Sequence, residues 1–372
     1  MDIKATWMRG GTSKCWVIES EDLDATQISP DQLLPRLFGS PDHRQIDGVG
    51  GGTSTTSKAM IIRRPIDDLV DVEFTFAQVG IEEAVVDWGS NCGNCSAAVG
   101  LYALEHGWVT PTGNMTEVVT RNTNTDQIIV QRIPTPTGQL PADPLATIPG
   151  VPFPGHRVGL GFRNPVGKTT GHLLPTGAAK ETLSTEHGSW TVSLVDAGAP
   201  LVILNGRDFA LEPDRFGSWA QDIEPHLQQL DRLRRRAAVR MGLAPTESSA
   251  ARAIPKIALI SAPSTVEDDV DVQVMMLSMG KPHPALAVTG SVALTVAALT
   301  AGTVINDVLP GGDRQRLRLR TPAGLLETWT DTESGTLVVG VDRTARTIAS
   351  STLYFPESLG LLTEVSLAGA TR

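Results

Sequence analysis

The residues with the clearest chemical potential lie in the stretch Gly89–Cys95, which reads Gly-Ser-Asn-Cys-Gly-Asn-Cys. We predict that Asp87-Trp88 ends a strand, that a tight turn follows, and that a buried helix runs on through Ser96 to a stop at Gly107. This order places the Cys92 thiol at a helix N-terminus, where free N–H groups and the helix dipole favour a thiolate and lower its pKa. The same N–H groups can bind a carboxylate. A reactive sulfur beside an anion site suits proton removal from a carbon next to a carboxylate. The alternative is that Cys92 is a small buried apolar residue, as most free cysteines are.

Several better-known kinds of site are absent from the sequence. Gly48–Lys58 is rich in glycine, but Ala59 follows the lysine where a P-loop needs Ser or Thr, and the glycine spacing gives no dinucleotide fingerprint. Cys92 and Cys95 have no second Cys/His pair at zinc spacing, so we predict no metal. Their Cys-x-x-Cys spacing lacks the βαβ context of a redox motif, and thiol redox chemistry remains a minor alternative. No Gly-x-Ser-x-Gly nucleophile motif occurs.

The composition narrows the class of partner. The 372 residues carry a net charge of −10, which argues against nucleic acid and anionic membranes but leaves room for a local cluster of cations around a small anion. Three cysteines and an N-terminus without an apolar signal core predict a cytoplasmic protein without a disulfide framework. The sequence allows a homodimer without specifying one.

Two similar stretches organise the expected fold. The helix after Cys92 is rich in small apolar residues and ends at Gly107, and Thr289-Gly290-Ser291 opens a similar helix that ends at Gly302. Strands flank both. We therefore expect two similar α+β units, each with a sheet around a central helix, and both helix N-termini facing one cleft. The run from Ala285 to Ile305 is uncharged and long enough to span a bilayer, but its glycines and small residues favour a buried core helix.

The remaining elements follow from capping residues and apolar periodicity. Ser29-Pro30 and Gly39 are typical of a helix start and stop. Residues 134–189 carry only short apolar runs, and we place the passage between two domains near 178–190, with domains at 1–182 and 183–372 and the last residues free to return to the first. We further predict strands at 72–76, 192–204, 256–261 and 270–278, a hairpin over 116–133 and one long helix over 218–241 that Gly242 stops.

Long motifs in a fixed order make the sequence similar to the PrpF-type isomerases, within the diaminopimelate epimerase-like superfamily. The resemblance runs through most of the chain. The motifs are Met8-Arg-Gly-Gly-Thr-Ser-Lys14, Gly39-Ser-Pro-Asp42, Gln45-Ile-Asp-Gly48, Thr53-Ser-Thr-Thr-Ser-Lys58, Val86-Asp-Trp-Gly-Ser-Asn-Cys-Gly-Asn94, Val239-Arg-Met-Gly-Leu243 and Leu277-Ser-Met-Gly-Lys281.

This resemblance implies a fold, a reaction and a catalytic pair. The fold would be α+β, with two similar domains that each wrap a mostly antiparallel sheet around a central helix, and an active site in the cleft between them. The family's catalytic lysine and cysteine correspond to Lys58 and Cys92. Racemases of the superfamily use a second cysteine where this chain has Thr289, so the two-thiol mechanism is closed to it. Family members rearrange unsaturated di- and tricarboxylic acids without a cofactor.

Holding such an acid requires cations and N–H donors near the two helix starts. His283 could instead be a satisfied loop histidine, and the Gly10-Gly11 turn could be purely structural. The candidate substrate-binding residues are Arg9, Thr12, Ser13, Lys14, Asn91, Gly93, Asn94, Lys281, His283, Thr289, Gly290 and Ser291.

The sequence therefore predicts a cofactor-independent isomerase that moves an allylic proton through a dienolate, with Lys58 and Cys92 as proton carriers. An aconitate or methylaconitate type of cis–trans or double-bond isomerisation is favoured. A 4-oxalomesaconate-type keto–enol tautomerase is the alternative, and a non-catalytic dicarboxylate-binding protein is the rival from another class. The order of proton transfer between Lys58 and Cys92 stays open.

Overall fold

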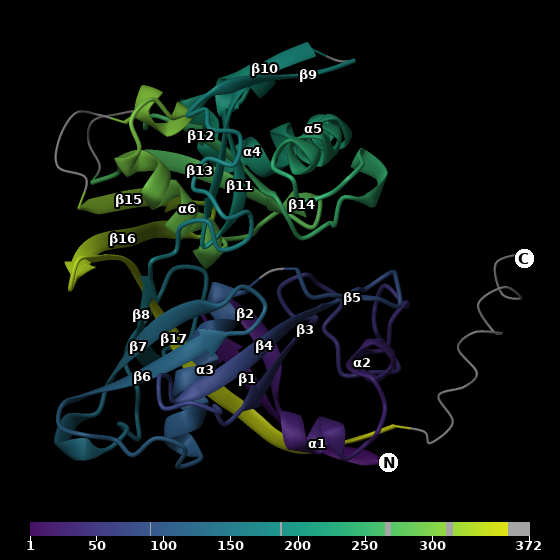
Figure 1. The fold of residues 1–372 in the computed structure, drawn as a ribbon, viewed down its shortest axis with the longest axis vertical. Helices are drawn as coiled ribbons and strands as arrows, with labels where there is room; N and C mark the ends of the chain where they lie inside the picture. The colour runs from purple at the N-terminus through teal and green to yellow at the C-terminus, as the bar shows by residue number, and fades with distance from the viewer. Residues whose placement is uncertain (90, 187, 265–268, 310–314, 356–372) are drawn as a thin grey trace, which may run out of the picture.

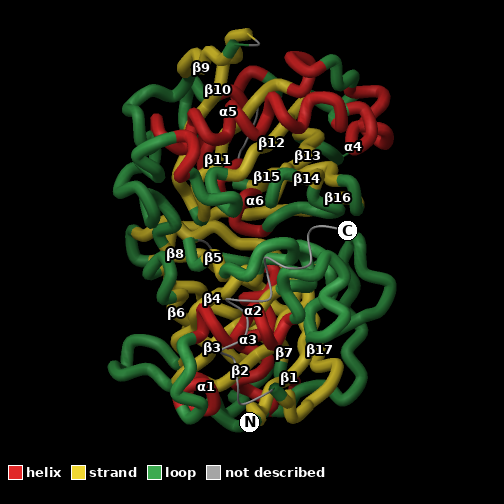
Figure 2. Tube along the Cα trace, turned by 90° about the vertical axis from the view of Figure 1, so that its right-hand side faces the viewer, coloured by secondary structure: helices red, strands yellow, loops and turns green. Residues whose placement is uncertain are grey.

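The computed structural model describes residues 1–89, 91–186, 188–264, 269–309 and 315–355. They form two lobes stacked along the long axis of the molecule (Figure 1). The first lobe contains β1 to β8 and β17, and the second contains β9 to β16 (Figures 1 and 2). Ser90, which belongs to the cysteine-containing motif, lies outside the described residues.

The strands of the first lobe close into a barrel. β1 pairs with β2, the pairing continues through β3, β4, β6, β7 and β8 to β17, and β17 pairs with β1. The β2–β3 and β4–β6 pairs are parallel and the others antiparallel. The bounds are β1 Asp2–Gly10, β2 Ser13–Glu19, β3 Lys58–Arg63, β4 Val72–Val79, β5 Val86–Asp87, β6 Met115–Asn122, β7 Gln127–Pro134, β8 His156–Arg163 and β17 Thr336–Tyr354.

Helix α3 (Gly93–Glu105) lies inside this barrel. It is buried on all sides from Gly93 to Leu104, which explains its nearly unbroken run of apolar and small residues. The small residues let the strands approach closely. A Cβ atom on Gly100 would lie 2.5 Å from the side-chain oxygen of Gln131, which instead accepts a hydrogen bond from the Gly100 N–H at 3.1 Å. The short helices α1 (Ser20–Asp24) and α2 (Pro30–Phe38) lie outside the barrel (Figure 1).

In the second lobe, helix α6 (Val288–Leu299) is buried and packs against β10, β11 and β16. Alternate residues of one strand face opposite sides of the sheet in this lobe: Leu201 and Ile203 join the core around α6, whereas Val202 and Leu204 face the core beneath α5 (Leu227–Arg240). Both faces are covered, so these strands are apolar throughout. The bounds are β9 Glu181–Thr185, β10 Gly188–Ala197, β11 Ala199–Asn205, β12 Lys256–Ser261, β13 Val272–Ser278, β14 Lys281–Pro282, β15 Arg316–Thr321, β16 Gly324–Glu333 and α4 Trp219–Asp222.

Single 3-10 turns complete the described elements. They lie at Pro136–Gly138, Gly206–Phe209, Pro213–Ser218, Glu224–His226, Glu247–Ser249 and Val304–Asp307.

One strand joins the two lobes. β17 begins beside β16 in the second lobe, where Val341 lies opposite Thr328, and it continues beside β8 and β1 to the pairing of Tyr354 with Asp2. The passage in the other direction lies near Pro165, whose carbonyl accepts a hydrogen bond from the Gly198 N–H at 2.8 Å. The predicted domain boundary after residue 182 is not tested by these contacts and stays a prediction.

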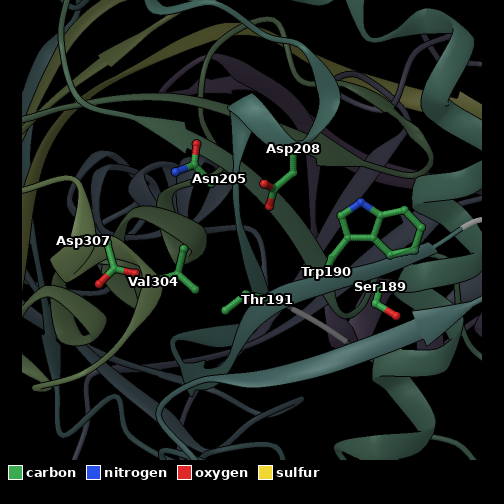
Figure 3. Close-up of a pocket in the computed structure, with 7 residues that line it drawn as sticks. All are labelled: Ser189, Trp190, Thr191, Asn205, Asp208, Val304 and Asp307. Carbon is green, nitrogen blue, oxygen red and sulfur yellow. The ribbon is translucent and has the colours of Figure 1, made fainter.

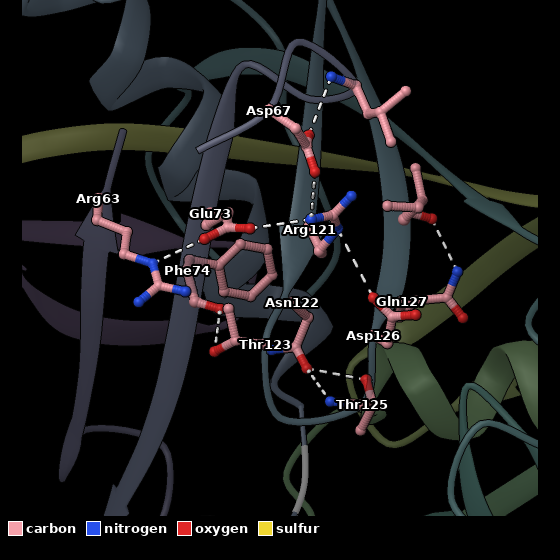
Figure 4. A network of polar contacts seen from close by, with 12 residues as sticks. Arg63, Asp67, Glu73, Phe74, Arg121, Asn122, Thr123, Thr125, Asp126 and Gln127 are labelled. Carbon is pink, nitrogen blue, oxygen red and sulfur yellow. Dashed lines mark hydrogen bonds and ion pairs between the residues drawn. The ribbon is translucent and has the colours of Figure 1, made fainter. Parts of the chain in front are cut away.

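Charged side chains fasten the outer face of the barrel. Glu73 on β4 accepts from Arg63 of β3 at 2.7 Å and from Arg121 of β6 at 3.0 Å, and Arg121 also bonds Asp67 at 3.2 Å (Figure 4). Glu73 is only 5% exposed, so both guanidinium groups compensate for its burial. The network therefore ties together three neighbouring strands that are not all consecutive in the chain.

Most predicted elements are present, and the exceptions have simple causes. The helix predicted after Ser29 spans Pro30–Phe38, and Gly39 ends it with a φ of 87°. The hairpin over 116–133 and the strand over 256–261 are confirmed. The single helix predicted over 218–241 is wrong, because it breaks into α4, a 3-10 turn at Glu224–His226 and α5; Pro225 within that turn has no backbone N–H to donate. β8 lies in a region where the sequence shows only short apolar runs, because four of its eight residues are glycine or arginine and weaken its apolar pattern.

The apolar run over 285–305 contains α6, which is buried and begins at Val288, two residues before Gly290. Within the described part of the chain, no helix combines the length and apolar character needed to cross a bilayer.

Candidate active site

The two central helices meet at their N-terminal ends. The side-chain N–H of Asn94 in α3 donates to the Leu286 carbonyl just before α6, at 3.3 Å. Gly93 lies against Val288, because a Cβ atom on Gly93 would be 2.6 Å from a Val288 methyl. The predicted convergence of both helix starts is therefore present, and free N–H groups from both lobes gather at one place.

A cavity lies at this junction and takes residues from both lobes. Its charged or titratable lining comprises Lys58, Lys256, Cys92 and His283, and no carboxylate occurs among the described lining residues. Such a site favours an anion. The lining residues are Ser13, Ser54, Lys58, Phe76, Gln78, Asn91, Cys92, Gly93 and Asn94 from the first lobe and Ala253, Lys256, Ser278, Met279, His283, Ala287, Val288 and Thr289 from the second.

Lys58 is the first residue of β3, and its neighbours on β4 fix its amine. Its Nζ donates to the Gln78 side-chain oxygen at 2.5 Å and lies 4.9 Å from the centre of the Phe76 ring. Gln78 is directly opposite in the sheet, and its own amide donates to the Ser57 carbonyl at 2.9 Å. The Lys58 residue is 7% exposed. A buried amine with only neutral partners can hold a substrate anion or exchange a proton with it.

Cys92 occupies the N-cap position of α3, as the sequence predicts, and it is half-buried. The expected lowering of its thiol pKa is wrong. A hydrogen bond with the Cys95 thiol and then burial raise the pKa of Cys92 well above its usual value, while Lys58 acts in the opposite direction. The helix start is enclosed by the second lobe, so loss of solvent outweighs the dipole. In the resting site, Cys92 is therefore a neutral thiol.

Lys256 and His283 supply the second-lobe side of the cavity. Lys256 begins β12, and burial followed by repulsion from Lys58 lowers its pKa to about 8. Burial, Lys58 and Lys256 lower the pKa of His283 to about 4, so this ring is neutral at physiological pH. The Ala285 N–H donates to its Nδ1 at 3.0 Å, which leaves the hydrogen on Nε2. His283 therefore offers one N–H donor.

Eight of the sequence-predicted site residues line this cavity. The two proposed proton carriers are brought together, as are both helix starts. These eight are Ser13, Lys58, Asn91, Cys92, Gly93, Asn94, His283 and Thr289.

The other six predicted residues are not among the described lining residues. Arg9 donates to the Gly11 carbonyl and to Thr344, so it braces the Gly-rich turn. Lys14 lies 5.1 Å from the Trp7 ring, and Lys281 is exposed on β14.

The remaining three are held by backbone contacts or packing. The Thr12 N–H donates to the Asn94 side-chain oxygen at 3.3 Å. Gly290 packs against Met276, and the Ser291 hydroxyl donates to the Val288 carbonyl at 2.8 Å. Thr12 therefore acts on the site through Asn94, and Gly290 and Ser291 pack within the start of α6.

Comparison of the chain with known proteins shows which family it belongs to. The family model described as PrpF protein matches residues 1–356. The chain belongs to the PrpF family. The 3-methylitaconate isomerase of Eubacterium barkeri is 34% identical over 95% of this chain and 97% of its own. The 4-oxalomesaconate tautomerase of Pseudomonas putida is 36% identical, covering 91% and 92%, and the 2-methyl-aconitate isomerase of Shewanella oneidensis is 33% identical, covering 87% and 88%.

Solved structures place this PrpF chain in the diaminopimelate epimerase-like fold. A methylitaconate-delta-isomerase structure is similar with a TM-score of 0.76 and 33% identity over 96% of this chain and 97% of the other. A hydroxyproline epimerase from Agrobacterium vitis, with a TM-score of 0.59 and 13% identity over 96% and 94%, shares the fold alone.

Lys256 is the main residue of this PrpF site that the sequence analysis missed. It stands 198 positions after Lys58, and only pairing with β11 and β13 brings it to the cavity. The one available signal was a lysine opening an otherwise apolar strand. Met279 was also missed as a site residue. Its φ of 54° places it in a tight turn beside the cavity, and the following Gly280 was the only signal of that turn in the sequence.

A second, larger hollow lies on the outer part of the second lobe, between Trp190, Asn205, Asp208 and Asp307 (Figure 3). Two carboxylates line it, and no cation is among its described lining residues. Its charge therefore opposes a polycarboxylate, and the junction of α3 and α6 is the better candidate for the active site.

Proposed function

We propose that this PrpF-family protein is an isomerase of unsaturated di- and tricarboxylic acids that transfers an allylic proton. The observation that carries the proposal is the common cavity of Lys58 and Cys92, which has a second amine and no carboxylate among its described lining residues. Two proton carriers and a cationic lining match the needs of carbon-acid chemistry. The names of the relatives support the same substrate class.

The proposed reaction needs a base, an acid and a place for negative charge. One carrier takes the proton from the allylic carbon, and the electron pair of that C–H bond spreads through the double bond into a carboxylate. The resulting dienolate accepts a proton at another carbon, or at the same carbon after bond rotation. Cys92 rests as a neutral thiol, which suits it to donate a proton to the dienolate, and we assign the first proton transfer to Lys58.

Charge on the dienolate is stabilised by groups already in position. The starts of α3 and α6 present N–H groups, and Lys256 adds a positive charge when protonated. We further infer that the two lobes are similar domains divided near residue 182, each with a mostly antiparallel sheet around its central helix, and that substrate binds in the cleft between them.

Within this class we favour an aconitate or methylaconitate type of cis–trans or double-bond isomerisation. The 4-oxalomesaconate type of keto–enol tautomerisation is the second candidate, and the 36% identity to a named tautomerase supports it. Both begin with the same proton removal.

Proton NMR in deuterated buffer tests the proposal. Purified protein is mixed separately with cis-aconitate, trans-aconitate, 2-methylaconitate and methylitaconate, and then with an oxo-acid. We expect one acid to isomerise with deuterium entering an allylic position. Lys58→Ala should abolish both signals, and Cys92→Ser should slow them about 100-fold or more.

A binding protein predicts a different result. It would hold the acids without deuterium exchange, and Cys92→Ser would leave its affinity unchanged. Absence of exchange with every acid would overturn the isomerase proposal. Isomerisation that survives in a Cys95→Ser variant would exclude a requirement for a Cys92–Cys95 redox pair.

A further inference from the structure

Two amines without an acidic partner enclose the candidate active site from opposite lobes. Lys58 comes from β3 and Lys256 from β12, and both line the same cavity. The Lys58 amine donates to the Gln78 side-chain oxygen. Lys256 is 6% exposed, and its amine donates to the Ala253 carbonyl at 3.2 Å. An ammonium has three donors, so Lys256 retains donors for a ligand.

The nearby carboxylate of Asp87 does not neutralise Lys256 by direct contact. Its Oδ1 accepts from the Gly89 N–H at 2.9 Å, and its Oδ2 accepts from the Ala253 N–H at 3.3 Å. The Ala253 carbonyl thus accepts a hydrogen bond from Lys256, and the Ala253 N–H donates one to Asp87. This fixes the position of the lysine while leaving its charge turned to the cavity that it lines.

A second unsatisfied donor lines the same cavity. The Ser96 hydroxyl donates to the Asn91 side-chain oxygen at 3.1 Å, which sets the orientation of that amide. The Asn91 Nδ2 has no hydrogen-bond partner among the described residues, although the residue is 3% exposed. A buried donor without a partner is costly unless a ligand satisfies it.

We propose that Lys256, with Asn91, binds a carboxylate group of the substrate that is remote from the carbon whose proton is transferred. The proposal rests on the proposed function and deepens it. It makes Lys256 a substrate-binding residue that selects for acids with a second or third carboxylate, and it separates this task from the proton transfer assigned to Lys58 and Cys92. It also gives the second lobe a direct contact with substrate.

The test uses tricarballylate, a saturated tricarboxylate that has no double bond to move. Its binding is measured by calorimetry for the wild type, Lys256→Met, Lys256→Arg and the control Lys4→Met, which removes an exposed lysine on β1. We expect Lys256→Met to weaken binding about tenfold to a hundredfold, Lys256→Arg to recover most of the affinity, and Lys4→Met to have no effect. Thermal melting checks that each variant is folded.

Kinetics with the isomerised acid distinguish binding from proton transfer. In Lys256→Met we expect KM to rise at least tenfold while kcat falls much less. Unchanged tricarballylate affinity, or a large loss of kcat in both Lys256→Met and Lys256→Arg at constant KM, would overturn the proposal. If Lys256→Met fails to fold, Lys256→Arg decides through its retained binding and the pH profile below.

The pH profile adds a readout that a purely structural lysine would not change. Lys256 faces Lys58, Cys92 and Asp87, and its pKa is lowered to about 8; His283 is the other titratable group of the lining. Wild-type affinity should fall as pH rises from 7 to 9 because the amine loses its charge. Lys256→Arg keeps its charge and should show a smaller fall. Identical pH profiles would contradict the proposal.

The proposed function and this inference fail in different ways. If tricarballylate binding depends on Lys256 but no acid is turned over, the isomerase proposal is contradicted and the carboxylate-binding role of Lys256 is supported. If an acid is turned over but binding does not depend on Lys256, the isomerase proposal is supported and the carboxylate-binding role of Lys256 is contradicted.

Discussion

At the scale of single residues, burial rather than residue type sets the chemistry of the site. A cysteine at a helix N-terminus is ordinarily a candidate thiolate, yet the pKa of Cys92 is raised because Cys95 and the closed junction favour its neutral form. The same enclosure lowers the pKa of Lys256 and of His283. A thiol that is neutral at rest is useful in a cavity that must admit a multiply charged anion.

The raised pKa predicts that Cys92 reacts slowly. At pH 8 we expect iodoacetamide to alkylate the native protein at least tenfold more slowly than a small free thiol, since less thiolate is present. Lys58→Met should slow the reaction further, because Lys58 acts to lower the pKa of Cys92. Cys92→Ser is the control for site selection, since Cys15 and Cys95 are buried. Alkylation faster than that of the free thiol would restore the thiolate hypothesis.

His283 predicts a defined loss of stability in mild acid. Burial and the facing charges of Lys58, Lys256 and Arg343 lower its folded pKa to about 4. An unfolded histidine titrates near 6.5, so the unfolded chain binds more protons as pH falls from about 6.5 to 4, and stability decreases across that window. The decrease attributable to this ring is about 3 kcal/mol.

Denaturant unfolding at several pH values measures this effect. His283→Asn keeps an acceptor near the Nδ1 position and should flatten the slope between pH 6.5 and 4, whereas His172→Asn, at an exposed histidine, should not. Equal slopes in all three proteins would show that other groups cause the acid sensitivity.

At the scale of elements, local signals in the sequence predict single helices and hairpins. They do not predict which distant strands pair with one another. Capping residues and apolar patterns place α2, α3 and the β6–β7 hairpin because each is decided by neighbours in the chain. β8 escapes notice because its partners are β7 and β17 and its small and charged residues weaken its own pattern. The split between α4 and α5 was accessible from Pro225 alone.

The contact between α3 and α6 predicts a sensitive position at Gly93. In Gly93→Ala the new methyl would meet Val288 at 2.6 Å, and either the helices separate or the cavity changes shape. We expect a loss of about 1–3 kcal/mol in the free energy of unfolding. We also expect the folded variant to lose activity, because the cavity lies at this contact. Gly217→Ala is a matched control with open space around its methyl. Wild-type stability and activity in Gly93→Ala would show that the two helix starts need not touch.

At the scale of the whole molecule, about half of the site was predictable. Motif residues and the echo between the two helices indicated Lys58, Cys92 and Thr289, which all line the cavity. Arg9 and Lys14 were candidates only because they are cationic and belong to a motif, whereas the structure gives them contacts elsewhere. Lys256 needed the arrangement of the lobes, which no local pattern contains.

β17 predicts that the two lobes are not independent. A chain ending at residue 335 loses the strand that pairs with β1, β8 and β16, and it exposes unpaired strand edges. We expect this chain to be degraded by limited proteolysis and to lack activity. A chain ending at Phe355 keeps every described strand and serves as the control. A folded, protease-resistant product from the shorter chain would contradict the dependence on β17.

The position of β17 in the chain also sets an order of events during synthesis. β1 pairs with β2, its neighbour in the chain, but its second partner, β17, begins 326 residues after β1 ends. The first barrel therefore cannot close while the chain is being made, and its open edge must persist through translation of nearly the whole second lobe. Contacts of such long sequence separation slow folding and lengthen the exposure of unpaired strands. The nascent protein, rather than the finished one, is where this fold most needs protection from aggregation.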